Sequence, residues 1–456
     1  MDNAHLWSLR LGFSGKQADE IKKTGIKTFL QNSFAAPLPT DEPLLINTAP
    51  HTLKEYWANV EKVKQDPEGR MALAKASELC LVDMKSWWIE KMHSNQYPLR
   101  EKMVLFWHNH FVAPVNIIYW LYQHNCLMRQ EALGNFRELT KKAIQANAQI
   151  QYLDNNSNRK GNYNENLSRE LLELFTLGAG NYTEEDIKNG ALGLAGLAID
   201  DDHARYMPNK ENNVPFTYFG KTGNFKSDEM VDIIFEQKAA PYHIVRKLLK
   251  WFIYDNPPED LVRHYGDYLR KVDYEIQPFL IKMFSEEYSK PTAGSKIKDP
   301  LVYILQVLSE LGFEDVNYSL VYYFLRSQNM DLYNQLNIKG WEGGRSWITA
   351  QLFMQRNTIA DRLCSIGQLL NKNVPRNVPP EGLYGFSAKV AFDTGNGNTG
   401  VIESLKDRLL FTTGTTLEES FKTILPYDFN PNGPSAKNGV LRLFNYIVKT
   451  PEFQII

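Results

Sequence analysis

The chain has 456 residues, with 51 Lys and Arg against 53 Asp and Glu, and a formal net charge of −2. Hydrophobic residues make up 43% and charged residues 23% of the sequence, which is typical of a folded globular protein and excludes the disordered class. The balanced charge argues against a dedicated nucleic-acid-binding protein, because such a protein needs a basic surface to meet phosphates.

Helical periodicity dominates the first 199 residues. Apolar residues recur every three to four positions, which is the pattern of amphipathic helices. A helix is also predicted after Thr183, which can cap it, and the glycines Gly190, Gly193 and Gly196 in this helix indicate close approach to a neighbour. The other helices of this part are predicted over residues 17–34, 53–65, 68–95, 99–110, 116–132, 135–153 and 165–178.

The helical pattern breaks between residues 200 and 226. Turn-forming Pro and Asn residues separate two short runs, 203–206 and 216–219, so we expect a short β-hairpin or loop excursion near 204–220. The sequence therefore predicts a mainly α protein with an N-terminal lobe (1–199), a connection (200–226) and a C-terminal lobe (227–456). The C-terminal lobe is predicted to contain a long Pro-, Asn- and Gly-rich loop at 373–400. Its helices are predicted over residues 227–237, 241–254, 258–271, 274–287, 300–312, 317–328, 348–371, 401–411, 416–425 and 436–449.

The apolar stretches of the sequence are short. Ile117–Tyr122, one of the most apolar, falls far below the ~18 residues of a membrane helix, so no membrane span is expected. The N-terminal segment MDNAHLWSLRLGFSG shows no signal peptide, so the sequence as written predicts a cytoplasmic protein. A cell-envelope location is expected instead if the sequence is part of a longer exported chain.

The first candidate site is the segment REKMVLFWHNHF, residues 100–111. It contains His108 and His110, and neutral imidazole is the commonest metal ligand in proteins. In a regular helix, however, residues two apart differ by about 200° in direction, so the two rings should diverge. Two alternatives follow: a buried histidine with a hydrogen-bond partner, or a metal ligand that acts together with distant residues.

The second candidate site is the segment NENLSRELLELFTLG, residues 164–178. Glu170 and Glu173 lie on one side of the predicted helix, and Arg169 is placed to pair with Glu173 four residues on. Two carboxylates that face a cleft can ligate a metal ion, or can act as an acid and a base if burial separates their pKa values. A solvated polar face with a helix salt bridge is the alternative.

At these motifs the sequence resembles the bacterial family called domain of unknown function 1800. The matching segments run from one end of the chain to the other, and FWHNHF followed by RELLELFTLG is the most specific combination. The resemblance implies a largely helical protein with no established activity. It also implies that His108, His110, Arg169, Glu170 and Glu173 matter together. Members are often encoded beside proteins similar to alkaline phosphatases and sulfatases, commonly exported, which suggests such a protein as a partner.

The sequence departs from this family pattern in two places: Ala195, Gly196 and Leu197 stand where many members carry Thr-Gly-Trp, and a second departure lies near the expected hairpin. Many members carry a His-Asp-x-Gly segment there, whereas residues 209–216 read NKENNVPF and contain no histidine. If that histidine acts as a ligand or base in relatives, this chain is a non-catalytic member, unless His203 takes its place.

Two functions follow from these observations. The first is a helical binding or assembly protein whose polar clusters are internal struts and which acts with a protein partner, in particular an exported hydrolase-like one. The second is a metal-dependent hydrolase in which His108, His110, Glu170 and Glu173 supply ligands for a divalent metal ion that activates water. In that case Glu170, Glu173 and Arg169 are the candidate catalytic residues. We favour the first function because the sequence contains no complete catalytic motif.

Overall fold

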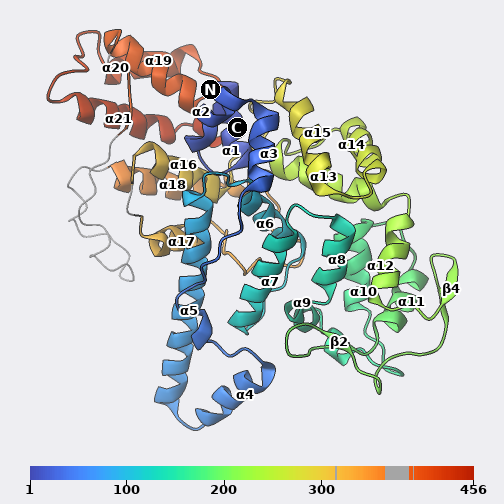
Figure 1. The fold of residues 1–456 in the computed structure, drawn as a ribbon. Coiled ribbons are helices and arrows are strands. Elements are labelled where there is room, and N and C mark those ends of the chain that lie inside the picture. The colour runs from blue at the N-terminus through green and yellow to red at the C-terminus, as the bar shows by residue number, and fades with distance from the viewer. Residues whose placement is uncertain (314–315, 365–389, 394) are drawn as a thin grey trace.

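The computed structural model describes residues 1–313, 316–364, 390–393 and 395–456 (Figure 1). The chain is 62% helical, and 21 α-helices lie within the described residues beside two small antiparallel sheets, which confirms the predicted mainly α class. No helix among these residues combines the length and the apolar character that crossing a bilayer requires. Most of the predicted loop at 373–400 lies outside the described residues.

The helices of the first 200 residues follow the predicted periodicity closely. One helix that the pattern did not predict precedes them, at Asn3–Leu11. The helices are α1 (Asn3–Leu11), α2 (Ala18–Thr24), α3 (Ile26–Ala35), α4 (Leu53–Lys62), α5 (Pro67–Ser94), α6 (Leu99–His110), α7 (Ile118–Glu131), α8 (Phe136–Ile144), α9 (Asn147–Tyr152), α10 (Asn166–Glu170) and α11 (Glu184–Leu194).

The region expected to form a hairpin contains two separate pairs of antiparallel strands. Strand β1 (Leu197–Ala198) pairs with β2 (Arg205–Tyr206), and β3 (Phe216–Tyr218) pairs with β4 (Lys221–Gly223). The predicted excursion is therefore confirmed, although it consists of two short hairpins. The approach predicted at the glycines of α11 is confirmed too, because an added Cβ at Gly190 would lie 2.1 Å from Oγ of Ser168.

The remainder of the chain is again helical. Its helices are α12 (Ser227–Glu236), α13 (Ala240–Phe252), α14 (Glu259–Lys271), α15 (Ile276–Tyr288), α16 (Pro300–Glu310), α17 (Tyr318–Ser327), α18 (Ala350–Cys364), α19 (Gly397–Leu409), α20 (Thr415–Ile424) and α21 (Ala436–Val448). Short 3₁₀ turns lie at Gly15–Gln17, Ile46–Thr48, Asn155–Ser157, Gly344–Trp347 and Glu452–Gln454.

The first helix packs against late parts of the chain. Arg10 of α1 is buried and donates through Nη2 to the carbonyl oxygen of Thr292 at 2.6 Å and to Oγ of Ser295 at 3.0 Å. The ring of Trp7 lies 5.8 Å from that of Phe284 in α15. Figure 1 shows α1 between α15 and the C-terminal helices. One continuous hydrophobic core consequently includes residues from both ends of the chain, while the division into two lobes stays a prediction.

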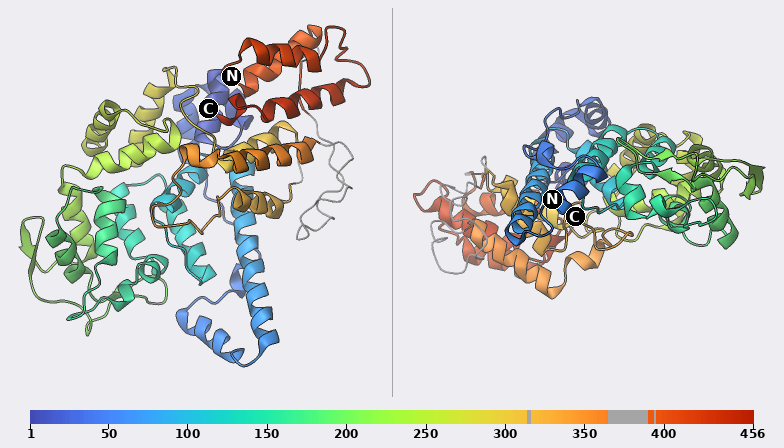
Figure 2. Two further views of the ribbon diagram at one scale, coloured as in Figure 1. Left: turned by 180° about the vertical axis from the view of Figure 1, so that it is seen from behind. Right: turned by 90° about the horizontal axis from the view of Figure 1, so that it is seen from below.

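Helix α4 and the N-terminal half of α5 project from the rest of the molecule (Figure 1 and the back view in Figure 2). We call residues 53–79 the arm. No residue of α4 is buried, and the buried residues of α5 begin only at Cys80. At 1.5 Å per residue, the exposed half of α5 extends about 20 Å.

Candidate functional site

Helix α6 carries both predicted histidines, and both are buried. The ring of His108 lies 4.8 Å from that of Trp88 and 5.2 Å from that of Tyr333. Its Nε2 accepts a hydrogen bond from the Asn125 amide at 3.1 Å, and this neutral tautomer fits the pKa, which burial holds well below its usual value. His108 is thus held in the core by contacts on one side of α6.

His108 belongs to a buried polar network around the ion pair of Glu101 and Arg129. The Arg129 guanidinium donates to both Glu101 carboxylate oxygens, at 2.7 and 2.9 Å, and to Oδ1 of Asn125 at 2.6 Å. Trp88 donates its indole N–H to the same carboxylate at 2.9 Å. The bidentate geometry and the complete set of partners make this network a rigid link between α5, α6 and α7.

His110 points to a different part of the core, as the helix geometry predicted. Its Nε2 donates to the carbonyl oxygen of Phe175 at 3.0 Å, and its Nδ1 is buried without a hydrogen-bond partner. Burial, followed by the charges of Lys247 and His243, holds its pKa well below the usual value. The imidazole is therefore neutral at pH 7 and retains one unused lone pair.

The second motif does not form a single regular helix. After α10, residues Leu171–Thr176 form a π-helix, and Gly178, two residues beyond its end, has a left-handed conformation (φ +81°). The carbonyl oxygens of Leu174 and Phe175 at the end of the π-helix accept from imidazoles, since His243 of α13 donates to Leu174 at 3.0 Å as His110 does to Phe175. Two histidines from distant segments thereby cap the π-helix.

The predicted pairing of Arg169 with Glu173 is wrong. Arg169 instead contacts Glu165 at 3.2 Å and Glu184 at 3.1 Å, and all three side chains are substantially exposed. The π-helix that begins at Leu171 alters the four-residue register on which the prediction depended. Glu173 accepts a hydrogen bond from the Tyr182 hydroxyl at 2.8 Å instead.

Glu170 is half-buried beside Glu173. Burial, and next the Glu173 charge, raise its pKa, while Arg169 and Lys339 lower it. No hydrogen bond or ion pair among the described residues joins His108 or His110 to either carboxylate. Nor does this part of the chain contain three or more His, Cys, Asp or Glu side chains grouped closely enough to hold a metal ion. The four-ligand metal site therefore stays a prediction.

A loop after α17 covers the C-terminal end of α6. The Trp341 backbone N–H donates to Oδ1 of Asn109 at 2.6 Å, and an added Cβ at Gly340 would lie 2.4 Å from the Asn109 carbonyl oxygen. The segment 340–347, which reads GWEGGRSW, is thus in direct contact with the FWHNHF motif. The glycine is required here because a side chain would collide with the α6 backbone.

All of these segments lie within the match to one family model. A family model described as protein of unknown function (DUF1800) matches residues 5–455, nearly the whole chain. The chain belongs to the DUF1800 family. This confirms the resemblance seen in the sequence. No curated protein and no solved structure matches this DUF1800 chain, so its function has to be argued from its own side chains.

Two residues of this DUF1800 chain join the site without having been predicted. His243 and Lys247 lie one turn apart on α13 and both bear on the pKa of His110. Their spacing of four residues on a strongly amphipathic helix was visible in the sequence. Nothing in it, however, indicated that this face of α13 would meet α6, because that contact depends on tertiary packing.

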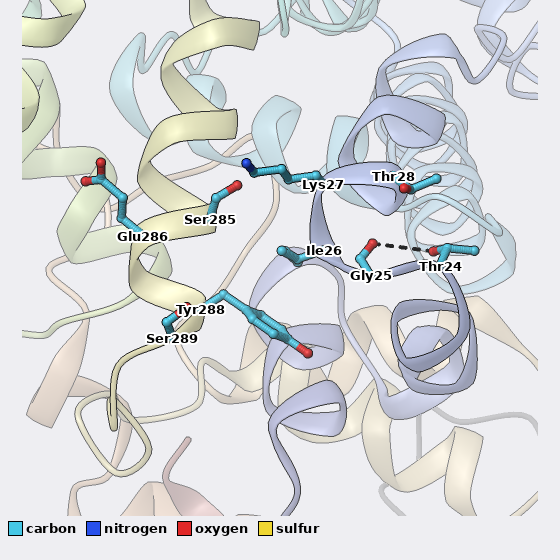
Figure 3. A pocket seen from close by; sticks show the side chains of 9 residues that line it. All are labelled: Thr24, Gly25, Ile26, Lys27, Thr28, Ser285, Glu286, Tyr288 and Ser289. Atoms are coloured by element: carbon cyan, nitrogen blue, oxygen red, sulfur yellow. Dashed lines mark hydrogen bonds between the residues drawn. The ribbon is translucent and has the colours of Figure 1, made fainter.

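A shallow pocket of ≈ 540 Å³ lies away from these motifs, between the start of α3 and the end of α15. Figure 3 shows Thr24, Gly25 and Lys27 on one wall and Ser285, Glu286 and Tyr288 on the other. Glu286 accepts from His264 at 3.0 Å, so its carboxylate already has a partner. None of the sequence-predicted site residues lines this pocket.

Proposed function

We propose that the protein is a helical binding or assembly protein that holds a protein partner through the arm, residues 53–79. The observation that carries this proposal is the exposure of apolar side chains on the arm: Trp57 is 58%, Met71 75% and Leu79 52% exposed. These are three of the eleven large hydrophobic side chains exposed in the described part of the chain, and three more, Leu38, Leu44 and Leu45, lie in the segment before the arm. Such a concentration marks an interaction surface.

The two helices of the arm leave much of their apolar surface exposed to solvent. Met71 and Leu79 are eight residues apart and lie on the same side of α5. Only the start of α4 is anchored, where Leu53 and Tyr56 pack beside Trp120. A pair of helices that buries so little of its apolar surface is marginally stable in water, so a partner that covers it gains apolar burial and orders the arm.

The charge of the arm favours a protein over other partners. Residues 53–79 contain five basic and five acidic side chains. A surface that binds nucleic acid or an anionic membrane requires an excess of Lys and Arg. The exposed Trp57 and Met71 side chains are of the types enriched at protein interfaces.

The buried polar residues of the FWHNHF region fit the same function, because they hold neighbouring helices together. His108 and the Glu101–Arg129 pair tie α5, which carries the arm, to α6 and α7. A rigid base fixes the point from which the arm projects. The family resemblance suggests an exported phosphatase- or sulfatase-like protein as the partner, and we propose that the arm binds a protein of this class.

Site-specific photo-crosslinking in native cells tests the proposal. A photoreactive amino acid at position 57 or 71 should give one dominant adduct, whereas position 427, where Tyr427 is 92% exposed, serves as the matched control. Mass spectrometry of the adduct then identifies the partner and tests its class. Equal adduct yields at all three positions would contradict binding by the arm.

The identified partner is then purified and titrated against wild type and the double variant Trp57→Glu/Met71→Glu. We expect the variant to lose binding while its melting temperature stays unchanged, because neither side chain is buried. An equally tight complex with the variant would show that the partner docks elsewhere.

A further inference from the structure

The face of α13 that lies against the π-helix and the Phe106 ring of α6 carries three nitrogen-bearing side chains in a row. His243, Lys247 and Trp251 are spaced by four residues and so lie on one side of the helix. The Trp251 ring lies 5.8 Å from the Phe106 ring, which in turn lies 6.0 Å from the ring of His110. We call this region the α6–α13 seam.

Four nitrogen atoms of the seam lack a partner among the described residues. Nδ1 of His110 and Nε1 of Trp251 are buried without a hydrogen bond. Lys247 makes neither an ion pair nor a hydrogen bond, and Nδ1 of His243 faces Gly178, where an added Cβ would lie only 2.7 Å away. Of the four, Nδ1 of His110 and Nε1 of Trp251 are buried. Unsatisfied buried polar groups are uncommon in folded proteins and call for an explanation, of which a bound ion is one.

The charges that act within the seam are all basic. The pKa of His110 is lowered by burial, then by Lys247 and His243, and burial and Lys247 hold the pKa of His243 at about 4. Burial, followed by Lys250, lowers the pKa of Lys247 to about 7. The seam therefore has basic groups without the counter-charge that would let them bind protons.

The acidic groups on the neighbouring elements have partners elsewhere. Glu173 of the π-helix accepts from Tyr182, and Glu259 of α14 is bound by Arg246. Asp255 lies 3.7 Å from Lys296, whose Nζ donates to the Lys250 carbonyl oxygen. None of these carboxylates acts as the counter-charge of Lys247.

We propose that the α6–α13 seam binds a tetrahedral oxyanion, the phosphate or sulfate group of a ligand, with Lys247 as its principal contact. An oxyanion supplies the hydrogen-bond acceptors that Lys247 and Trp251 lack, and it also supplies the negative charge that the seam lacks. Nδ1 of His110 is itself an acceptor in the neutral ring and is not one of the donors to the anion. Lys247 and Trp251 donate directly, and His243 donates through Nδ1 once it takes up a proton. Lys247 and His243 keep part of their surface exposed, so the ligand can enter from solvent. This site is independent of the partner-binding arm.

Calorimetric titration of the full chain with sodium sulfate and with inorganic phosphate tests this site, with acetate as the carboxylate comparison. The variant Lys247→Met keeps the length of the side chain but removes its charge. Lys271→Met, at the exposed end of α14, is the matched control. We expect saturable binding at one site in wild type and in the control, and a loss of about tenfold or more in Lys247→Met.

Proton linkage gives a second readout. Sulfate does not change its charge between about pH 8 and about pH 6, so a pH dependence of its affinity reports on the protein. Because the bound anion draws protons onto the seam, affinity should rise as pH falls, and the rise should be smaller in His243→Gln. His243→Gln retains a donor for the Leu174 carbonyl oxygen and removes the Nδ1 nitrogen.

The alternative outcomes overturn the proposal. They are the absence of saturable binding in wild type, equal affinity in Lys247→Met and wild type, or tighter binding of acetate than of sulfate. Lys247→Met is expected to fold, because it replaces an unpaired, desolvated amine by an apolar group. If it does not fold, the affinities of His243→Gln and of Lys271→Met decide the matter.

Discussion

Lowering the pH from about 7 to about 5 should destabilise the folded chain strongly, because five of its nine histidines are held neutral in the structure. Burial is the largest cause in each case. These histidines are His93, His108, His110, His124 and His243. Below a pH of about 6.5 they take up protons in the unfolded chain but not in the folded one.

The size of the effect follows from the folded-state pKa values. For His93, His124 and His243 the pKa falls from 6.5 to about 4. Between about pH 7 and about pH 5 each therefore costs about 2 kcal/mol of unfolding free energy, or about 6 kcal/mol together. His108 and His110 act in the same direction. A domain typically has only about 5–15 kcal/mol of stability, so this loss is large.

Urea unfolding followed by tryptophan fluorescence, at both pH values and constant salt, measures this loss. Glu170 and Glu310, whose pKa values burial raises, oppose it but are fewer. His93→Gln should reduce the pH dependence by about 2 kcal/mol, because it removes one of the titrations. A stability at pH 5 within about 1 kcal/mol of that at pH 7 would refute the reasoning.

Three substitutions test the packing of the motifs by urea unfolding. Glu101→Gln leaves the buried Arg129 guanidinium without its counter-charge and should lower the free energy of unfolding by about 3–5 kcal/mol. A loss near zero would mean that water reaches this ion pair. Gly178→Ala adds a Cβ at φ +81°, 2.7 Å from Nδ1 of His243, and should cost about 1–3 kcal/mol. Arg169→Ala removes only exposed ion pairs and should cost less than about 1 kcal/mol. A larger loss in this last variant would contradict its assignment to the surface.

The one α-helix of the described residues that the periodicity missed is α1. Leu6, Trp7, Leu9 and Leu11 are all buried, so the helix has no polar side and shows no amphipathic stripe. A local signal was present in Asp2, whose carboxylate accepts from the His5 backbone N–H as a helix cap. Capping residues thus locate a fully buried helix better than the hydrophobic pattern does.

The π-helix escaped prediction for a different reason. A single wide turn changes the direction of the following side chains but leaves the apolar character of residues 165–178 intact. Periodicity therefore still indicated one helix over this segment. The error became visible only in the pairing of Arg169, which depends on register.

The candidate site could be predicted in part. Helix geometry alone required His108 and His110 to point in different directions, and their contacts with Asn125 and Phe175 show that they do. The partners themselves could not be predicted, because they come from other segments of the chain. His243 and Lys247 join the site only through the packing of α13 on α6, and no local pattern encodes such a long-range contact.

The position of α1 also determines when it can acquire its native contacts during biosynthesis. The helix leaves the ribosome well before Thr292 and Ser295, which bind Arg10 and are synthesised nearly 300 residues later. At typical elongation rates of 5–20 residues per second, this delay is about 15–60 s. Throughout that time Trp7 lacks the rings of Phe284 and Tyr288, which it contacts in the folded chain. We therefore expect the nascent chain to be a chaperone substrate through its first helix.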